Sequence, residues 1–177
     1  MRNSAIALGK VLERLNKFKT SFPNAYHSLE PDIYLDNSNA KNDLPIPATW
    51  VQILAVDDGF EILDSPGEGR PDGFIFYPAE EIPTMHTQFM HLVLADNAKF
   101  PPYYLFVASS YSDHLIGLDT SNIDDVGDCP VVLVWLEDEG YNIGERWDSI
   151  SDFLNTVLDF ATPYQEDEDS PALNRSF

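Results

Sequence analysis

Two stretches, one near each end of the chain, have apolar residues at spacings of three and four, the pattern of one buried helix face. The first predicts an amphipathic helix over residues 4–18. Its apolar positions are Leu8, Val11, Leu12, Leu15 and Phe18. The second predicts a helix that begins near Asp148 and is stopped by Pro163. Its apolar positions are Ile150, Phe153, Leu154, Val157, Leu158 and Ala161.

Three weaker patterns lie between these helices. Trp50, Ile53 and Leu54 predict a short helix that runs into a turn at residues 57–60, whose glycine suits a left-handed cap. Residues 78–95 permit another short helix, which Pro83 should interrupt. Prolines and a run of turn-forming polar residues predict a loop or linker over residues 20–43.

Four segments rich in aromatic or β-branched residues predict strands: residues 73–77, 103–109, 114–118 and 130–136. The close spacing of these segments favours antiparallel neighbours, with a hairpin turn at residues 111–113. A longer acidic loop should precede the fourth strand.

Helices on either side of antiparallel strands predict an α+β domain with a central, mainly antiparallel sheet flanked by helices. A chain of 177 residues has the length of one domain with extensions, and it can bury a sufficient core without disulfides or metal. We divide it into an N-terminal helix and linker (1–43), a main domain (44–162) and an acidic disordered tail (163–177).

The acidic residues are unevenly distributed. Residues 44–177 hold 25 Asp and Glu against four Lys and Arg, whereas the first 43 residues hold five acidic and six basic side chains. The formal net charge is −20 at pH 7. A field of this sign repels phosphate backbones and anionic lipid, and it steers cationic proteins toward the surface. We therefore expect a basic protein partner, no nucleic acid and no membrane, although acidity also serves solubility alone.

The basic residues of the first predicted helix have two interpretations. They are Lys10, Arg14, Lys17 and Lys19. They could contact a membrane surface, or they could pair with the acidic body of the same protein. Intramolecular pairing is favoured, because the opposite charge is already present on the chain.

The single Cys129 cannot form an internal disulfide, and the first ten residues lack the apolar core of a signal peptide. No run approaches the roughly 18 apolar residues of a membrane span. These features predict a cytoplasmic protein.

Candidate nucleophiles and metal ligands are few. Cys129 lies among acidic residues, which should raise the pKa of its thiol and reduce its nucleophilicity. His86 and His91 are five residues apart, a spacing that does not stack two rings on one helical face, so a structural role is favoured over zinc. His114 has serines and an aspartate nearby, but adjacent side chains on a strand point to opposite faces. We expect no metal, no cofactor and no catalytic residues.

Two loops and the paired carboxylates resemble known functional motifs only in part. Residues 67–73 lack the Lys-Ser/Thr pair of a phosphate-binding loop and predict a turn. Residues 119–128 lack the glycine and the bidentate glutamate of an EF-hand loop. Two carboxylates in a cleft could hydrolyse glycosides, but with 30 acidic residues some must lie close together by chance.

The order of several short motifs over about residues 40–161 resembles the SUKH superfamily, the Smi/Knr-like domains. A Leu-Pro pair, an aromatic residue, a short helix and an Asp-Gly turn open the match. Residues 105–119 look like the family's paired strands, residues 130–135 like its Pro-Val strand, and residues 147–154 like its closing helix. The positions with a structural role in these motifs are Leu44, Pro45, Trp50, Gly59, Phe60, Trp135 and Phe153.

The resemblance implies a non-catalytic binding domain. Bacterial members are often immunity proteins that block a cognate toxin, frequently a nuclease, while fungal relatives act in signalling and cell-wall regulation. A nuclease must be cationic to hold nucleic acid, so an acidic inhibitor can capture it quickly. A regulatory scaffold without a toxin and a carboxylate-dependent hydrolase are the alternatives. The residues that we expect on the acidic face are Asp57, Asp58, Glu61, Glu137, Asp138 and Glu139.

Overall fold

The computed structural model describes residues 4–29, 44–63, 73–94, 100–111, 114–137 and 140–168. Four helices, one short 3₁₀ helix and seven strands follow one another along these residues. They are α1 (Ser4–Ser21), β1 (Tyr26–Ser28), α2 (Ala48–Leu54), β2 (Phe60–Leu63), β3 (Gly73–Phe76), α3 (Ile82–Leu94), β4 (Tyr104–Ser110), β5 (His114–Asp119), η2 (Thr120–Asn122), β6 (Val131–Glu137), β7 (Gly140–Trp147) and α4 (Ile150–Glu168).

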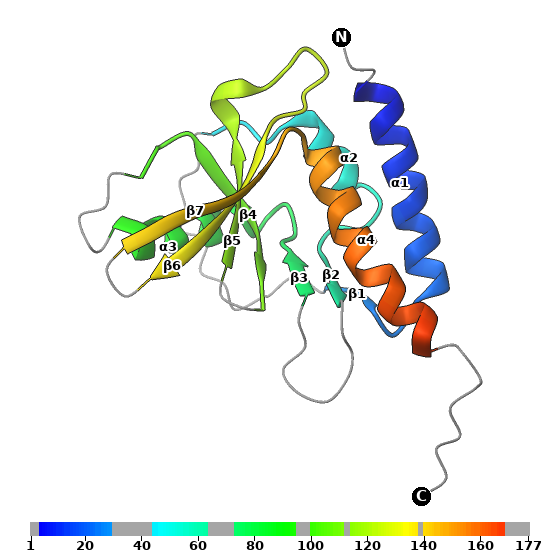
Figure 1. Cartoon of the computed structure of the whole chain (residues 1–177). Helices are drawn as coiled ribbons and strands as arrows, with labels where there is room; N and C mark the ends of the chain where they lie inside the picture. Colours follow the sequence, from blue (N-terminus) through cyan, green and yellow to red (C-terminus); the bar gives the residue numbers. More distant parts are fainter. Residues whose placement is uncertain are drawn as a thin grey trace, which may run out of the picture.

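The seven strands form one sheet in which chain order and spatial order coincide, from β1 at one edge to β7 at the other. Every neighbouring pair is antiparallel. The α+β class with a central antiparallel sheet is therefore confirmed. Figure 1 shows that β4 to β7 form the larger part of the sheet and that β1 to β3 lie beside α4.

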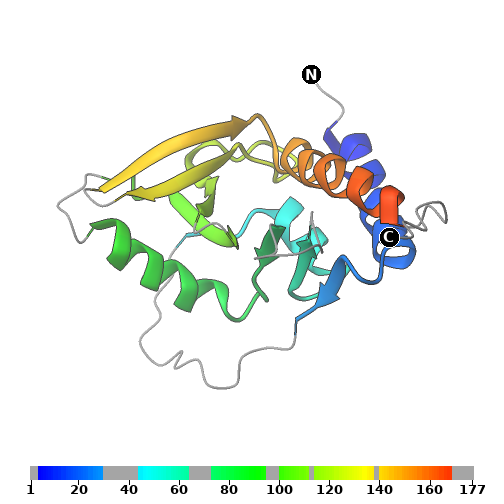
Figure 2. The same cartoon turned by 60° about the horizontal axis from the view of Figure 1, so that its bottom comes forward.

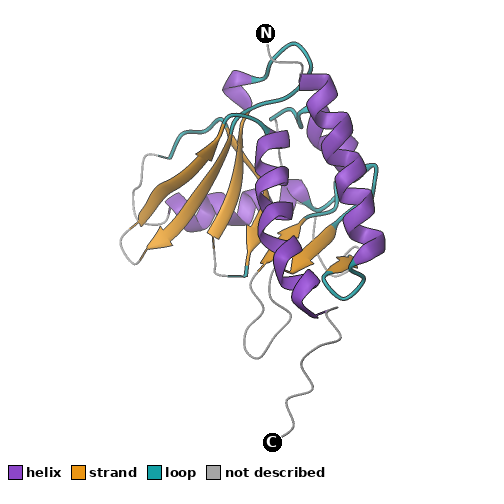
Figure 3. Cartoon of the chain, turned by 45° about the vertical axis from the view of Figure 1, so that its right-hand side comes forward, coloured by secondary structure: helices purple, strands orange, loops and turns teal. Residues whose placement is uncertain are grey.

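Helices pack on both faces of the sheet. On one face α1 and α4 run side by side, and Figure 3 shows the same arrangement from another direction. Their buried side chains join the main core with residues of α2 and of the first three strands. On the other face α3 covers the long strands (Figure 2). There Phe89 and Met90 pack against the cluster that includes Phe106 and Val134. No helix among the described residues is long and apolar enough to cross a membrane.

The first helix is part of the main core. Leu8, Val11, Leu15 and Phe18 are buried there, on the face that the spacing predicts. Arg14 donates to the side chain of Asn155 at 3.2 Å and forms an ion pair with Asp159 of α4. Lys19 forms a second ion pair, with Asp57. Intramolecular pairing of the basic helix is thus confirmed for Arg14 and Lys19.

Three strands were not predicted. β1 lies inside the segment interpreted as a loop, but its three residues are too few to show an alternating pattern. β2 has only four residues and directly follows the turn at Gly59. β7 is an edge strand whose residues 142–146 are all exposed, and glycines and charged residues separate its apolar side chains.

The two prolines predicted to interrupt helices do not do so. Pro83 is the second residue of α3, where a backbone N–H would have no helical partner in any case. α4 continues past Pro163 to Glu168, so the helix includes the start of the segment assigned to the tail. A proline removes one donor from a helix but keeps helical dihedral angles. Predictions for residues 30–43, 64–72, 112–113 and 169–177 lie outside the described residues.

Gly59 is a backbone constraint at the entry to β2. It has φ of 88°, a conformation that L side chains rarely adopt. A Cβ at this position would also lie 2.5 Å from Cγ of Pro78. Its carbonyl accepts a hydrogen bond from the Leu29 N–H at 3.0 Å, so the turn also holds the chain after β1. The predicted glycine conformation is confirmed, although it lies beyond the α2 cap at Ala55.

We expect Gly59→Ala to lower the free energy of unfolding by about 1–3 kcal/mol, because the new side chain has a strained φ and contacts Pro78. Urea denaturation measures this value. Gly9→Ala is the matched control: it lies within α1 with nothing within 4 Å of the added Cβ, and it should stabilise the protein by about 0.5–1 kcal/mol. Equal stabilities of the two variants would contradict the assigned role of Gly59.

Candidate functional site

The six residues predicted for an acidic face divide between two parts of the structure. Asp57 and Asp58 lie in the turn after α2, and Glu61 lies in β2. Glu137 ends β6, where its backbone pairs with Gly140 of β7. Asp138 and Glu139 lie outside the described residues.

Asp57 binds groups from the N-terminal segment of its own chain. Lys19 Nζ lies 2.6 Å from the carboxylate, Tyr26 donates its hydroxyl at 3.3 Å, and Ser28 also donates its hydroxyl. Burial opposes ionisation of the carboxyl, but the hydrogen bonds from Lys19 and Ser28 outweigh it and lower the pKa of Asp57. Burial, together with the Asp57 charge, raises the pKa of Tyr26.

Glu61 and Asp58 are also bound within the chain. Glu61 Oε1 lies 2.7 Å from His27 Nδ1, and its other oxygen accepts the hydroxyl of Tyr111. Burial and this hydrogen bond raise the pKa of Tyr111 to about 12. The exposed Asp58 accepts the Ala79 N–H at 2.8 Å. These carboxylates therefore hold strands β1 to β4 and their connections together, and a role in partner binding stays a prediction.

A different set of acidic residues lines a groove at one end of the molecule. The groove has a volume of about 600 Å³ and lies between the loop after η2, the start of α4 and the start of α1. We call it the acidic groove. Its lining residues are Ala7, Asn122, Asp124, Asp125, Val126, Asp128, Cys129, Pro130, Asp148, Ser149 and Asp152.

Two of these aspartates fix the loop that forms one wall. Asp124 accepts the N–H groups of Val126 and Asp128 at 3.0 and 2.9 Å. The buried Asp128 accepts the N–H groups of Cys129 and Ile150 at 2.8 and 2.9 Å, and so joins the loop to the first turn of α4. Burial raises the pKa of Asp128, although its two hydrogen bonds oppose that shift. The exposed Asp125 and Val126 lie between them, at the rim.

The groove was not predicted from the sequence. Its acidic residues occur in two runs, at 124–128 and 148–152, and these meet only because β6, β7 and the turn into α4 return the chain to the loop. The density of carboxylates in each run was visible in the sequence. No feature of the sequence indicated that the two runs face one another.

Cys129 lies at the buried side of the groove. Burial, with the charges of Asp128 and Asp119, raises the pKa of its thiol to about 12. The raised pKa is as predicted, but burial is its main cause, ahead of the neighbouring acids. A thiol with this pKa is protonated at neutral pH, so it is a poor nucleophile.

His86 and His114 both contact neighbouring residues of the sheet. His86 is buried in α3, and its Nδ1 accepts the Phe106 N–H at 3.3 Å, which supports the structural role expected for it. Burial lowers the pKa of His86. His114 stacks on Trp135, with ring centroids 5.3 Å apart. Among the described residues, no group of three or more His, Cys, Asp and Glu side chains could hold a metal ion.

The structural motif residues divide into core and surface. Trp50, Phe60 and Phe153 are fully buried, and Leu44 packs partly buried against them. Pro45 is exposed at the start of the segment that leads to α2. Trp135 lies in the predicted strand but is 42% exposed. It is therefore a surface residue and not part of the core.

We expect Asp57→Asn to lower the free energy of unfolding at pH 7 by about 1–3 kcal/mol, because it removes charge-assisted hydrogen bonds. The folded pKa of Asp57 lies below its unfolded value, so its contribution is complete above the unfolded pKa and is lost as the pH falls through the folded pKa. The stability difference from the wild type should therefore narrow below about pH 4.

Urea denaturation at pH 7 and at about pH 3 tests this prediction. Asp125→Asn, at an exposed position of the groove rim, is the control and should change stability by less than about 0.5 kcal/mol. A difference for Asp57→Asn that stays constant across this pH range would contradict the assignment.

Comparison with known proteins supplies one match. The model of the SMI1 / KNR4 family (SUKH-1) matches residues 33–156. The matched region spans α2 to the first part of α4 and includes the loop of the acidic groove. No curated protein and no solved structure matches the chain.

Proposed function

The chain belongs to the SMI1/KNR4 family (SUKH-1), and from this premise we propose that it is a non-catalytic protein-binding domain that acts as an immunity protein. In this proposal it binds a cognate toxin in the cytoplasm and thereby neutralises it. The partner that fits its charge best is a basic toxin of the nuclease type.

The acidic groove is the observation that carries this proposal. Five aspartates line it, and none of its lining residues is basic. A surface that binds nucleic acid presents Lys and Arg side chains to phosphates, and the same side chains would be attracted into a groove lined by carboxylates. Binding there would cover the surface that the toxin needs for its substrate.

The construction of the groove suits rapid recognition. Asp124 and Asp128 fix the loop through backbone N–H groups, so the rim is ordered before a partner arrives. The net charge of −20 extends the attraction beyond direct contact. Association should therefore be fast at low salt, and the association rate should fall as added salt screens the field.

The test uses a catalytically inactive form of a toxin domain encoded beside this protein, with association rates measured at several salt concentrations. We expect Asp125→Asn/Asp148→Asn to slow association by about 3- to 10-fold at low salt and to flatten its salt dependence, because two charges leave the groove. In cells, the unmodified protein should protect against the active toxin.

The control is Glu13→Gln/Glu80→Gln, which removes the same charge from exposed positions in α1 and before α3. It should alter the association rate by less than about 2-fold, because neither residue lines the groove. Equal effects of both double variants would show that only net charge matters and would contradict binding at the groove. A toxin that is neither bound nor neutralised would contradict the immunity role itself.

A further inference from the structure

The sheet has an aromatic surface at the far end of the β6–β7 hairpin that no helix of the described residues covers. Val132 and Val134 belong to the cluster under α3, so alternation along β6 places Trp135 on the opposite face. That is the face on which α4 packs, but α4 lies beside the sheet and does not extend over this end of the hairpin (Figures 1 and 2). Trp135 is consequently 42% exposed in the second half of a seven-residue strand.

The indole of Trp135 is held by its neighbours on both sides. His114 is its partner across β5 and β6, and the two rings stack at an interplanar angle of 22°. On the other side β7 has a bulge, where the register shifts opposite Leu133. Gly144 lies in this bulge, and a Cβ there would come within 2.9 Å of the indole nitrogen. The exposed ring is thus seated against a position that accommodates only glycine without a shift.

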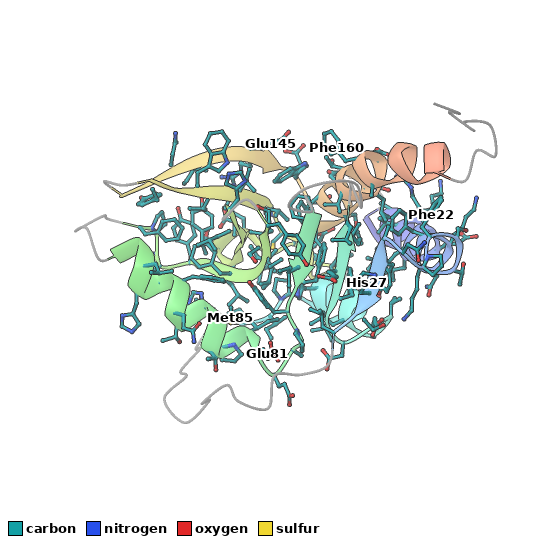
Figure 4. The ribbon with its side chains drawn as sticks, turned by 90° about the horizontal axis from the view of Figure 1, so that it is seen from below. Phe22, His27, Glu81, Met85, Glu145 and Phe160 are labelled. Carbon is teal, nitrogen blue, oxygen red and sulfur yellow. The ribbon has the colours of Figure 1, made fainter. Side chains whose placement is uncertain are left out.

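One carboxylate belongs to the same bulge as Gly144. Glu145, the other bulge residue, is exposed, and Figure 4 shows it on the same side of the molecule as the exposed Phe160 of α4. Arg146, the next residue in β7, forms an ion pair with the buried Asp119 at 2.9 Å, so its charge is matched within the chain. We call His114, Trp135, Asn142, Gly144 and Glu145 the β6–β7 face.

We propose that the β6–β7 face docks an arginine-bearing segment of the partner protein, with the guanidinium against the solvent-exposed part of the Trp135 ring and paired with Glu145. This inference rests on the proposed function, because it names a second contact of the same basic partner. Arginine is the cation that fits best, since its planar group stacks on an aromatic ring and hydrogen-bonds a carboxylate at the same time. Partly exposed tryptophans held in place by neighbours are frequent energetic centres of interfaces.

Other occupants fit the surface less well. A second copy of the chain would bring a net charge of −20 toward a molecule that already carries the same charge. An anionic ligand would meet Glu145 and the same overall field. A neutral polar ligand would use the ring and Asn142 but would gain nothing from the carboxylate, and this difference provides the test.

The test is a titration of the full-length ¹⁵N-labelled protein with a synthetic peptide that carries two arginines between glycines, at about 0.15 M salt to screen diffuse attraction. The same peptide with citrulline in place of arginine is the neutral counterpart. The three tryptophans of the chain supply indole N–H signals, and Trp135→Phe assigns one of them. We expect saturable shifts of the Trp135 signal with arginine and little change with citrulline.

Trp135→Ala should weaken arginine-peptide binding by roughly 5- to 30-fold, the range of a cation–π contact as it becomes desolvated. Glu145→Gln should weaken it by about 2- to 5-fold. The matched controls are Leu92→Ala, an apolar side chain of α3 that is 57% exposed, and Glu13→Gln, both of which should leave binding unchanged. Circular dichroism of each variant checks that it is folded.

Three results would overturn this inference: equal shifts with the citrulline peptide, shifts confined to the loop of the acidic groove, or no binding of the arginine peptide. The outcome is separable from that of the proposed function. If the toxin is neutralised and its binding is unchanged by Trp135→Ala, the immunity role stands and the β6–β7 face is not a contact. If the arginine peptide binds Trp135 but no toxin is neutralised, the face stands and the immunity role fails.

Discussion

The structure depends on an aromatic cluster centred on Phe76. Its ring stacks on Phe60 with centroids 4.4 Å apart and contacts Trp50 and Phe153 at 5.8 and 6.1 Å. Tyr26 extends the cluster by stacking on Phe60 at 5.2 Å. These rings come from β1, β2, β3, α2 and α4, so one set of contacts joins segments more than 100 residues apart. Aromatic pairs of this kind stabilise a core beyond the area that they bury.

The cluster also determines where the charged groups lie. Because α2 and β2 are held at its two sides, the turn between them presents Asp57 to Lys19 and to the hydroxyls of Tyr26 and Ser28. Because Phe153 anchors the first turns of α4, the backbone of Ile150 reaches Asp128 and closes the acidic groove. Packing in the core therefore divides the carboxylates into those that bind the chain itself and those that face solvent.

Because of this division, only part of the large negative charge can act on a partner. Two of the few basic side chains, Arg14 and Lys19, hold α1 to the rest of the molecule, and Arg146 is paired with Asp119. Within the acidic groove the carboxylates have no basic neighbour among the lining residues. Several charges of one sign on an ordered surface favour an oppositely charged partner, both in the rate of encounter and in the choice of partner. The groove and the β6–β7 face offer different contacts to such a partner, one electrostatic and one aromatic.

The sequence by itself determined the α+β class, the two long amphipathic helices, four strands of the sheet, the turn at Gly59 and the net charge. These properties follow from local periodicity and composition, which do not depend on distant residues. The sequence also determined the family, through short motifs in a fixed order. It did not reveal β1, β2 and β7, because short strands and exposed edge strands lack the alternation that identifies a strand.

Only the tertiary structure decided which carboxylates are exposed and could contact a partner. The sequence analysis chose Asp57 and Glu61 for an acidic face and did not choose Asp125, yet the fold places Lys19 and His27 against the first two and leaves Asp125 exposed at the groove rim. Trp135 similarly had the pattern of a core residue, but α4 does not extend over the end of the β6–β7 hairpin and the side chain is 42% exposed. The physical reason is the same in both cases. Burial and ion pairing depend on which distant segments come together in space, and the local pattern of residues does not contain that information.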